Sequence, residues 1–164
     1  MIKCESVIGA VAAIGVLMVT PASAQEWRHA SASSLKRHVT VEKQHRLILQ
    51  VNSNDPAMMN LALNNATNVV QSYKDRGEKV AIEIVTFGPG LHMLREDTSP
   101  VKARIETLAL STPEISYKAC GNTRENMRKA ENKEIPIIPQ AKVVSSGVVR
   151  VMELQERGWS YVKP

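Results

Sequence analysis

Cys120 is the residue of this sequence with the clearest capacity for chemistry. The chain has two cysteines, and the other one, Cys4, lies in an N-terminal segment that has the features of a cleaved export signal. Exported proteins normally pair their cysteines, because their compartment is oxidising. The single remaining thiol therefore has two open explanations: it packs as a small hydrophobic residue, or it is retained for its reactivity.

The position of Cys120 favours a thiolate. The cysteine follows an apolar run, 115–119, and precedes a helix that we expect to begin at Asn122, where Asn122 and Glu125 have the spacing of a capping box. Backbone N–H groups and the dipole at a helix start favour an anion, and they lower the pKa of a thiol below its free value of about 8.5. A thiolate at this place would be nucleophilic at neutral pH.

Neighbouring residues are compatible with sulfur chemistry on this thiolate. Lys118 and Arg124 can add positive charge, and Gly121 lets a sulfur donor approach the backbone closely. The chain has no CxxC motif, which excludes a thioredoxin-like dithiol within one chain. A lone thiolate can still carry one sulfur atom as a persulfide or form a mixed disulfide.

The elements that must position Cys120 alternate along the chain. From Arg46 onward, short apolar runs alternate with segments of helical periodicity. We expect strands at 47–51, 79–87, 115–119, 141–144 and 159–162, and helices at 56–76, 99–110, from 122 and at 148–157. Such alternation predicts an α/β fold, a doubly wound and mainly parallel sheet of about five strands with helices on both faces.

Ligands of doubly wound sheets bind at the carboxyl ends of the strands. Polar residues and glycines follow four of the expected strands, and these are the candidate pocket or anion-binding residues: Asn52, Asn54, Asp55, Gly88, Gly90, Gly121, Asn122, Ser145 and Ser146. Several of these residues also suit a structural role. Asp55 before Pro56 is expected to cap a helix, and Gly88-Pro89-Gly90 is expected to form a tight turn, since it lacks the lysine of a phosphate loop. Ser145 and Ser146 can cap a helix or hold a sulfur oxyanion.

Cys120 with His92 and Met93 offers soft ligands for copper(I). The pattern favours a simpler interpretation, in which Met93 is a core residue and His92 belongs to a surface loop, so no metal site is predicted. The sequence has no nucleotide fingerprint, hydrolase triad or metal-hydrolase motif. We therefore expect no cofactor and, at most, a sulfur carrier or transferase.

The N-terminal part predicts export. Lys3 precedes an apolar stretch from Val7 to Val19, and Ala22-x-Ala24 has the small residues that signal peptidase needs, so residues 1–24 are expected to be removed. The apolar stretch is shorter than the roughly 20 residues of a membrane span. Residues 25–45 are polar and lack periodicity, which indicates a flexible leader, and a single domain follows at 46–164.

The net charge of +5 does not change on this cleavage, because Lys3 and Glu5 leave together. A nucleic-acid partner is not expected of an exported chain in which aromatic residues make up 4%. The basic residues around Cys120 can attract a small anion or form a solvated helix face. The expected location is periplasmic or otherwise exported, without membrane embedding.

Several segments together resemble the DsrE/DsrF-like family of sulfur-relay proteins. They are Gln50-Val51 with Asn54-Asp55-Pro56, Asn60 to Ala66, Glu83 to Leu91, Ala119-Cys120-Gly121-Asn122-Thr123, and Gly158 to Pro164, and they span most of 46–164. The resemblance implies a flavodoxin-like fold, a homo-oligomer of three or six subunits, and a cysteine that passes sulfane sulfur between a donor and an acceptor. Only Cys120 can inherit that role.

Two classes of function follow from these observations. In the first, the protein is a periplasmic sulfur carrier that holds a persulfide on Cys120. In the second, it is a non-catalytic ligand-binding or assembly module in which Cys120 only packs. Copper handling is a third and weaker alternative. Because export departs from the cytoplasmic relay members of the family, tRNA thiolation is not expected.

Overall fold

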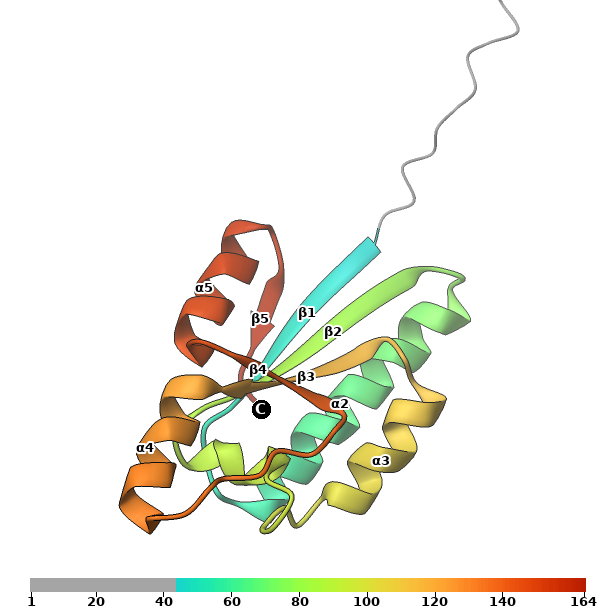
Figure 1. Ribbon diagram of the computed structural model, residues 1–164. Coiled ribbons are helices and arrows are strands. Elements are labelled where there is room, and N and C mark those ends of the chain that lie inside the picture. Colours follow the sequence, from blue (N-terminus) through green and yellow to red (C-terminus); the bar gives the residue numbers. More distant parts are fainter. Residues whose placement is uncertain (1–43) are drawn as a thin grey trace, which may run out of the picture. The chain divides into compact units, whose positions relative to one another are not determined.

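The computed structural model describes residues 44–164, which form a five-stranded sheet flanked by helices (Figure 1). The expected export signal and almost all of the expected leader lie outside the described residues. The first strand begins at Gln44, two residues before the expected start of the domain. Within the described range, no helix is both long and apolar enough to cross a membrane.

All pairings within the sheet are parallel, and the strand order is β4-β3-β2-β1-β5. The strands are β1 (Gln44–Val51), β2 (Lys79–Thr86), β3 (Ile115–Cys120), β4 (Ala141–Val144) and β5 (Ser160–Val162). The helices are α2 (Pro56–Asp75), the 3-10 helix η1 (Gly88–Leu94), α3 (Lys102–Ser111), α4 (Gly121–Glu131) and α5 (Gly147–Glu156). The predicted α/β class with a parallel sheet of five strands is confirmed.

The chain steps outward from β1 to β4 and then returns across the sheet to place β5 beside β1. The connection through α5 therefore runs in the opposite direction to the earlier ones. Since parallel connections are right-handed, α5 must cover the other face of the sheet. Figure 1 shows α5 well apart from α2 and α3. The fold is doubly wound, as predicted.

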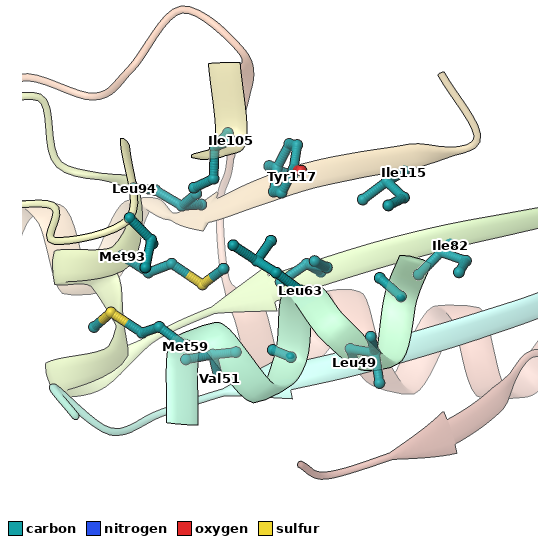
Figure 2. Close-up of a cluster of buried hydrophobic side chains, with 14 of the residues drawn as sticks. Leu49, Val51, Met59, Leu63, Ile82, Met93, Leu94, Ile105, Ile115 and Tyr117 are labelled. Atoms are coloured by element: carbon teal, nitrogen blue, oxygen red, sulfur yellow. The ribbon is translucent and has the colours of Figure 1, made fainter. Parts of the chain in front are cut away.

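The larger part of the core lies between the sheet and α2, α3 and η1. Alternate strand residues, Leu49, Val51, Ile82, Ile84 and Tyr117, face this side. Their partners are Met59 and Leu63 of α2, Met93 and Leu94 of η1, and Ile105 of α3, which point toward one another in Figure 2. Met93 is fully buried, which confirms that it is a core residue.

A smaller core lies on the opposite face, under α5. Ile48 and Val85 pack there against Val151 and Leu154, with Phe87 and Trp159 partly buried at the margin. The same face carries Glu83, a carboxylate that is only 3% exposed. The Arg150 side chain of α5 binds both of its oxygens, at 2.6 Å and 2.9 Å. This pair fixes α5 to the central strand.

The capping residues expected for α2 and α5 are confirmed, whereas the expected starts of α3 and α4 differ from the structure. Asp55 caps α2 by accepting a hydrogen bond from Ala57 N at 2.8 Å, as expected from Asp-Pro. Ser146 caps α5, accepting from Val149 N at 3.4 Å. Helix α3 begins at Lys102 rather than Ser99, and the Ser99 hydroxyl donates to Met93 O in η1.

The predicted start of α4 is wrong. The helix begins at Gly121, so Cys120 itself is the extended N-cap residue and Asn122 lies in the first turn. The expected capping box does not form: Glu125 pairs instead with Arg128 at 2.8 Å and Lys129 at 3.4 Å, one turn ahead. The cysteine is therefore closer to the helix start than the sequence indicated.

Candidate functional site

The sulfur of Cys120 lies where the N-termini of α4 and α5 meet. The Thr123 hydroxyl and the backbone N–H groups of Gly147, Thr123 and Asn122 surround this side chain and favour its charged form. Three of these donors belong to the first turn of α4, and Gly147 is the first residue of α5. Two helix starts, which both favour an anion, converge on one thiol.

These contacts change the acidity of the thiol. Burial alone would raise the pKa of Cys120, because a charged sulfur loses its hydration; the residue is 4% exposed. The hydrogen bonds from Thr123, Gly147 and Asn122 outweigh that effect, so the net result is a pKa below the usual value of a cysteine. The arrangement stabilises a thiolate inside the protein.

Thr123 connects the sulfur to the end of the neighbouring strand. The Thr123 hydroxyl accepts a hydrogen bond from Gly88 N at 3.0 Å, and Gly88 is the residue at the start of η1. With this acceptor position occupied, the hydroxyl proton is free to point at sulfur. The ends of β2 and β3 therefore cooperate in orienting one donor toward Cys120.

Close packing requires a glycine at the start of α5. A Cβ atom added to Gly147 would lie 2.9 Å from Phe87 Cδ1 and 3.3 Å from Cys120 Cβ. The missing side chain lets the N–H group of Gly147 reach the sulfur. Gly121, at the start of α4, is also closely packed, because a Cβ atom there would lie 3.0 Å from Val144 O.

The predicted pocket residues are distributed over several places. Asn54 and Gly88 line one cavity, which Thr123 also lines. Ser145 and Ser146 line a different cavity at the end of β4, and Gly121 lines a third. Asn122 donates its backbone N–H to Ser145 O at 3.1 Å, and this N–H group also lies beside the thiol.

The remaining three candidates have structural surroundings. Asp55 is the cap of α2. Gly90 is buried against the end of β1, where an added Cβ atom would lie 2.2 Å from Val51 O. Asn52 is half-buried beside this contact. Gly88-Pro89-Gly90, expected as a tight turn, is the first part of η1.

Lys118 and Arg124, the two basic residues near Cys120 in the sequence, contact other groups rather than the thiol. Lys118 shares the α5 face of the sheet, where its Nζ lies 3.8 Å from Glu83 Oε2; burial lowers its pKa. Arg124 donates to Ile135 O at 2.8 Å and pairs with Glu134 at 3.7 Å. Thiolate stabilisation therefore comes from hydrogen bonds and helix starts rather than from a paired cation.

Copper ligands do not gather at Cys120. Met93 belongs to the large core under α2, and His92 Nδ1 lies 2.8 Å from Thr98 Oγ1. Among residues 44–164, no group of three or more His, Cys, Asp and Glu side chains is arranged to hold a metal ion.

Thr123 and Gly147 are the site residues that sequence reasoning missed. Thr123 is the third residue after Cys120, which is the position where a helix N-cap side chain meets the backbone. That spacing is a usable signal. Gly147 has no comparable signal, because its contact with the sulfur depends on how α5 returns across the sheet.

Comparison with known proteins supports the fold and leaves function open. A solved structure of MTH1491, a protein of unknown function from Methanobacterium thermoautotrophicum, is 26% identical with a TM-score of 0.61, over 73% of this chain and 99% of that chain. Neither a family model nor a curated protein matches the sequence.

Proposed function

We propose that this protein is an exported sulfur carrier that holds sulfane sulfur as a persulfide on Cys120. The observation that supports this most strongly is the convergence of two helix starts and the Thr123 hydroxyl on one sulfur atom. A thiolate is the form of cysteine that attacks sulfane sulfur. The resemblance to DsrE/DsrF-like proteins suggests the same chemistry, with the cysteine in the same place.

The chemical step needs no oxidant. The Cys120 thiolate attacks the outer sulfur of a persulfide or polysulfide, a new S–S bond forms, and the S–S bond of the donor breaks, so that a persulfide donor leaves as a thiolate and a polysulfide donor leaves as a shorter polysulfide anion. The reverse step hands the sulfur to an acceptor and regenerates the Cys120 thiolate. A leaving group of low pKa departs faster, so the hydrogen bonds that stabilise the thiolate assist release as well as uptake.

Sulfur uptake tests this proposal. Purified protein is treated with inorganic polysulfide, and its intact mass is taken beside that of Cys120→Ser. We expect a gain of at least one sulfur atom that reductant removes and that Cys120→Ser lacks. A variant that gains the same mass would show that another group reacts, and a native protein without gain would make Cys120 a packing residue.

The proposal includes export and a homo-oligomer of three or six subunits. An exported product recovered from cells should begin near Gln25, which its intact mass reports. Self-association is supported by four exposed apolar side chains on α5 and the adjacent edge strand: Val143, Val148, Val149 and Met152. Light scattering of the native protein measures the subunit number, and a monomer that takes up sulfur would separate the two parts of the proposal.

A further inference from the structure

A cavity of about 410 Å³ opens next to the thiolate site. Its walls come from the ends of three neighbouring strands: Asn54 follows β1, Gly88 and His92 follow β2, and Thr123 and Met127 belong to α4 after β3. This volume lies within the range of small-molecule sites, about 300–1,000 Å³. The carboxyl ends of parallel strands are also where such folds bind their ligands.

The two principal walls, η1 and α4, are held together by a buried arginine. Arg95 directly follows η1 and is 1% exposed. Its guanidinium binds Glu131, at the end of α4, at 2.5 Å and 2.9 Å, and Asp97 at 2.9 Å and 2.8 Å. It also lies 3.8 Å from the sulfur of Met127, a residue of the cavity wall. A bidentate ion pair therefore links the two walls of the cavity.

The lining of the cavity contains no Asp, Glu, Lys or Arg, although the chain as a whole carries +5. Pro89, Met127 and Ala130 provide carbon and sulfur surface. The side-chain amides of Asn54 and Asn126 make no hydrogen bond to another residue within 44–164, so both can bond to a ligand. Such a lining suits a small neutral molecule with an amide group and gives an anion no paired cation.

Thr123 joins this cavity to Cys120. The residue lines the cavity, lies three residues after Cys120 in the first turn of α4, and favours the charged form of the thiol through its hydroxyl. Thr123 therefore belongs both to the cavity wall and to the surroundings of the thiol. A persulfide adds a second sulfur to Cys120 and extends the reactive atom beyond the buried thiol.

We propose that this cavity binds the exchange partner of Cys120, and that the partner is a neutral, amide-bearing thiol of low molecular weight. This inference rests on the proposed function. The thiolate of the partner attacks the outer sulfur of Cys120–S–SH, the S–S bond of the protein breaks, and the products are R–S–SH and the Cys120 thiolate. The proton stays on the transferred sulfur, and no further oxidant or reductant takes part.

The test measures discharge of sulfur from the loaded protein. Full-length protein carrying Cys4→Ser, which leaves Cys120 as its one thiol, is loaded with inorganic polysulfide. It is then mixed with N-acetylcysteamine, a neutral amide thiol, or with thioglycolate, an anionic thiol. Intact mass measures the loss of sulfur from the protein with time. Each discharge rate is divided by the concentration of the ionised form of the added thiol. We expect a rate that saturates with N-acetylcysteamine and rises linearly with thioglycolate.

Ala130→Leu fills the cavity from an exposed position of α4, and Ala103→Leu is the matched control on α3. We expect Ala130→Leu to lower the kcat/KM for N-acetylcysteamine by about tenfold, the low end of what a steric mismatch in a pocket costs. Thioglycolate discharge and the Ala103→Leu protein should not change. Asn126→Arg should raise the thioglycolate rate instead.

Equal, linear rates for both thiols, or an Ala130→Leu protein that discharges like the wild type, would overturn the inference while leaving Cys120 as a carrier. Failure of Cys120 to load at all would overturn the proposed function and this inference with it. The loading and discharge steps therefore separate the two failures.

Discussion

Replacing Thr123 with valine removes one donor from the Cys120 sulfur while preserving the shape of the side chain. The hydroxyl is the largest of the hydrogen-bonding contributions that lower the thiol pKa. A hydrogen bond to a charged group stabilises it by about 1.5–3 kcal/mol. Thr123→Val should therefore destabilise the thiolate by an energy of this order and raise the thiol pKa.

The alkylation rate should fall by less than the thiolate fraction. At a fixed pH below the pKa, a rise of one unit lowers the thiolate fraction about tenfold, but a more basic thiolate is more nucleophilic, with a Brønsted coefficient of about 0.4–0.5. The net fall is then about threefold. A full pH profile of the alkylation rate therefore measures the effect more clearly than one rate, because it gives the pKa itself.

Thr123→Ser is the matched control, since it retains the hydroxyl. Thr123→Val also leaves Gly88 N without its acceptor, which should destabilise the protein by about 1 kcal/mol. Denaturant unfolding checks that the variant is folded where the profile is taken. A Thr123→Val protein with the thiol pKa of the wild type would refute the assignment of Thr123 as a donor to the thiolate.

Three further predictions concern the supports of the site. Gly147→Ala should raise the thiol pKa and cost about 1–2 kcal/mol of unfolding free energy, because its Cβ would press on Phe87; alkylation profiles and urea unfolding measure both. Arg150→Met should cost about 3 kcal/mol by leaving Glu83 buried beside only Lys118, and the double variant with Glu83→Gln should be more stable than Arg150→Met alone. The hydrogen bonds to Arg95 lower the pKa of Glu131 to about 2, so the stabilising effect of this carboxylate is complete above its usual pKa of 4.5 and is lost as the pH falls toward 2. Glu131→Gln should therefore lower the free energy of unfolding more at pH 7 than at pH 2. Equal losses at the two pH values would count against the pairing.

The alternation of apolar runs and helical segments was sufficient to predict the fold, because each parallel strand pair needs a crossover. Asp55-Pro56 likewise marked the start of α2 correctly. The start of α4 was misplaced, because the capping-box pattern of Asn122 and Glu125 is local, whereas the helix begins one residue earlier, where Cys120 takes the N-cap position. A local sequence pattern does not contain the tertiary contacts that determine where a helix begins.

The residues around Cys120 could be predicted only in part, because some of them reach it through tertiary contacts. Cys120 could be identified from its place between a strand and a helix. The contact from Gly147 depends on the strand order β4-β3-β2-β1-β5, which brings α5 back over the end of β3. Five of the nine strand-end candidates line three different cavities, because each cavity depends on side chains from helices whose positions the periodicity does not fix.

The central claim is that the fold, and not merely the presence of a thiol, makes Cys120 take up sulfur. The most direct measurement compares native and urea-unfolded protein carrying Cys4→Ser after brief treatment with polysulfide, followed by alkylation and mass analysis of the Cys120 peptide. The account predicts an added sulfur on Cys120 that forms faster in the native protein. Uptake only by the unfolded chain, with a native thiol that stays unmodified, would contradict it.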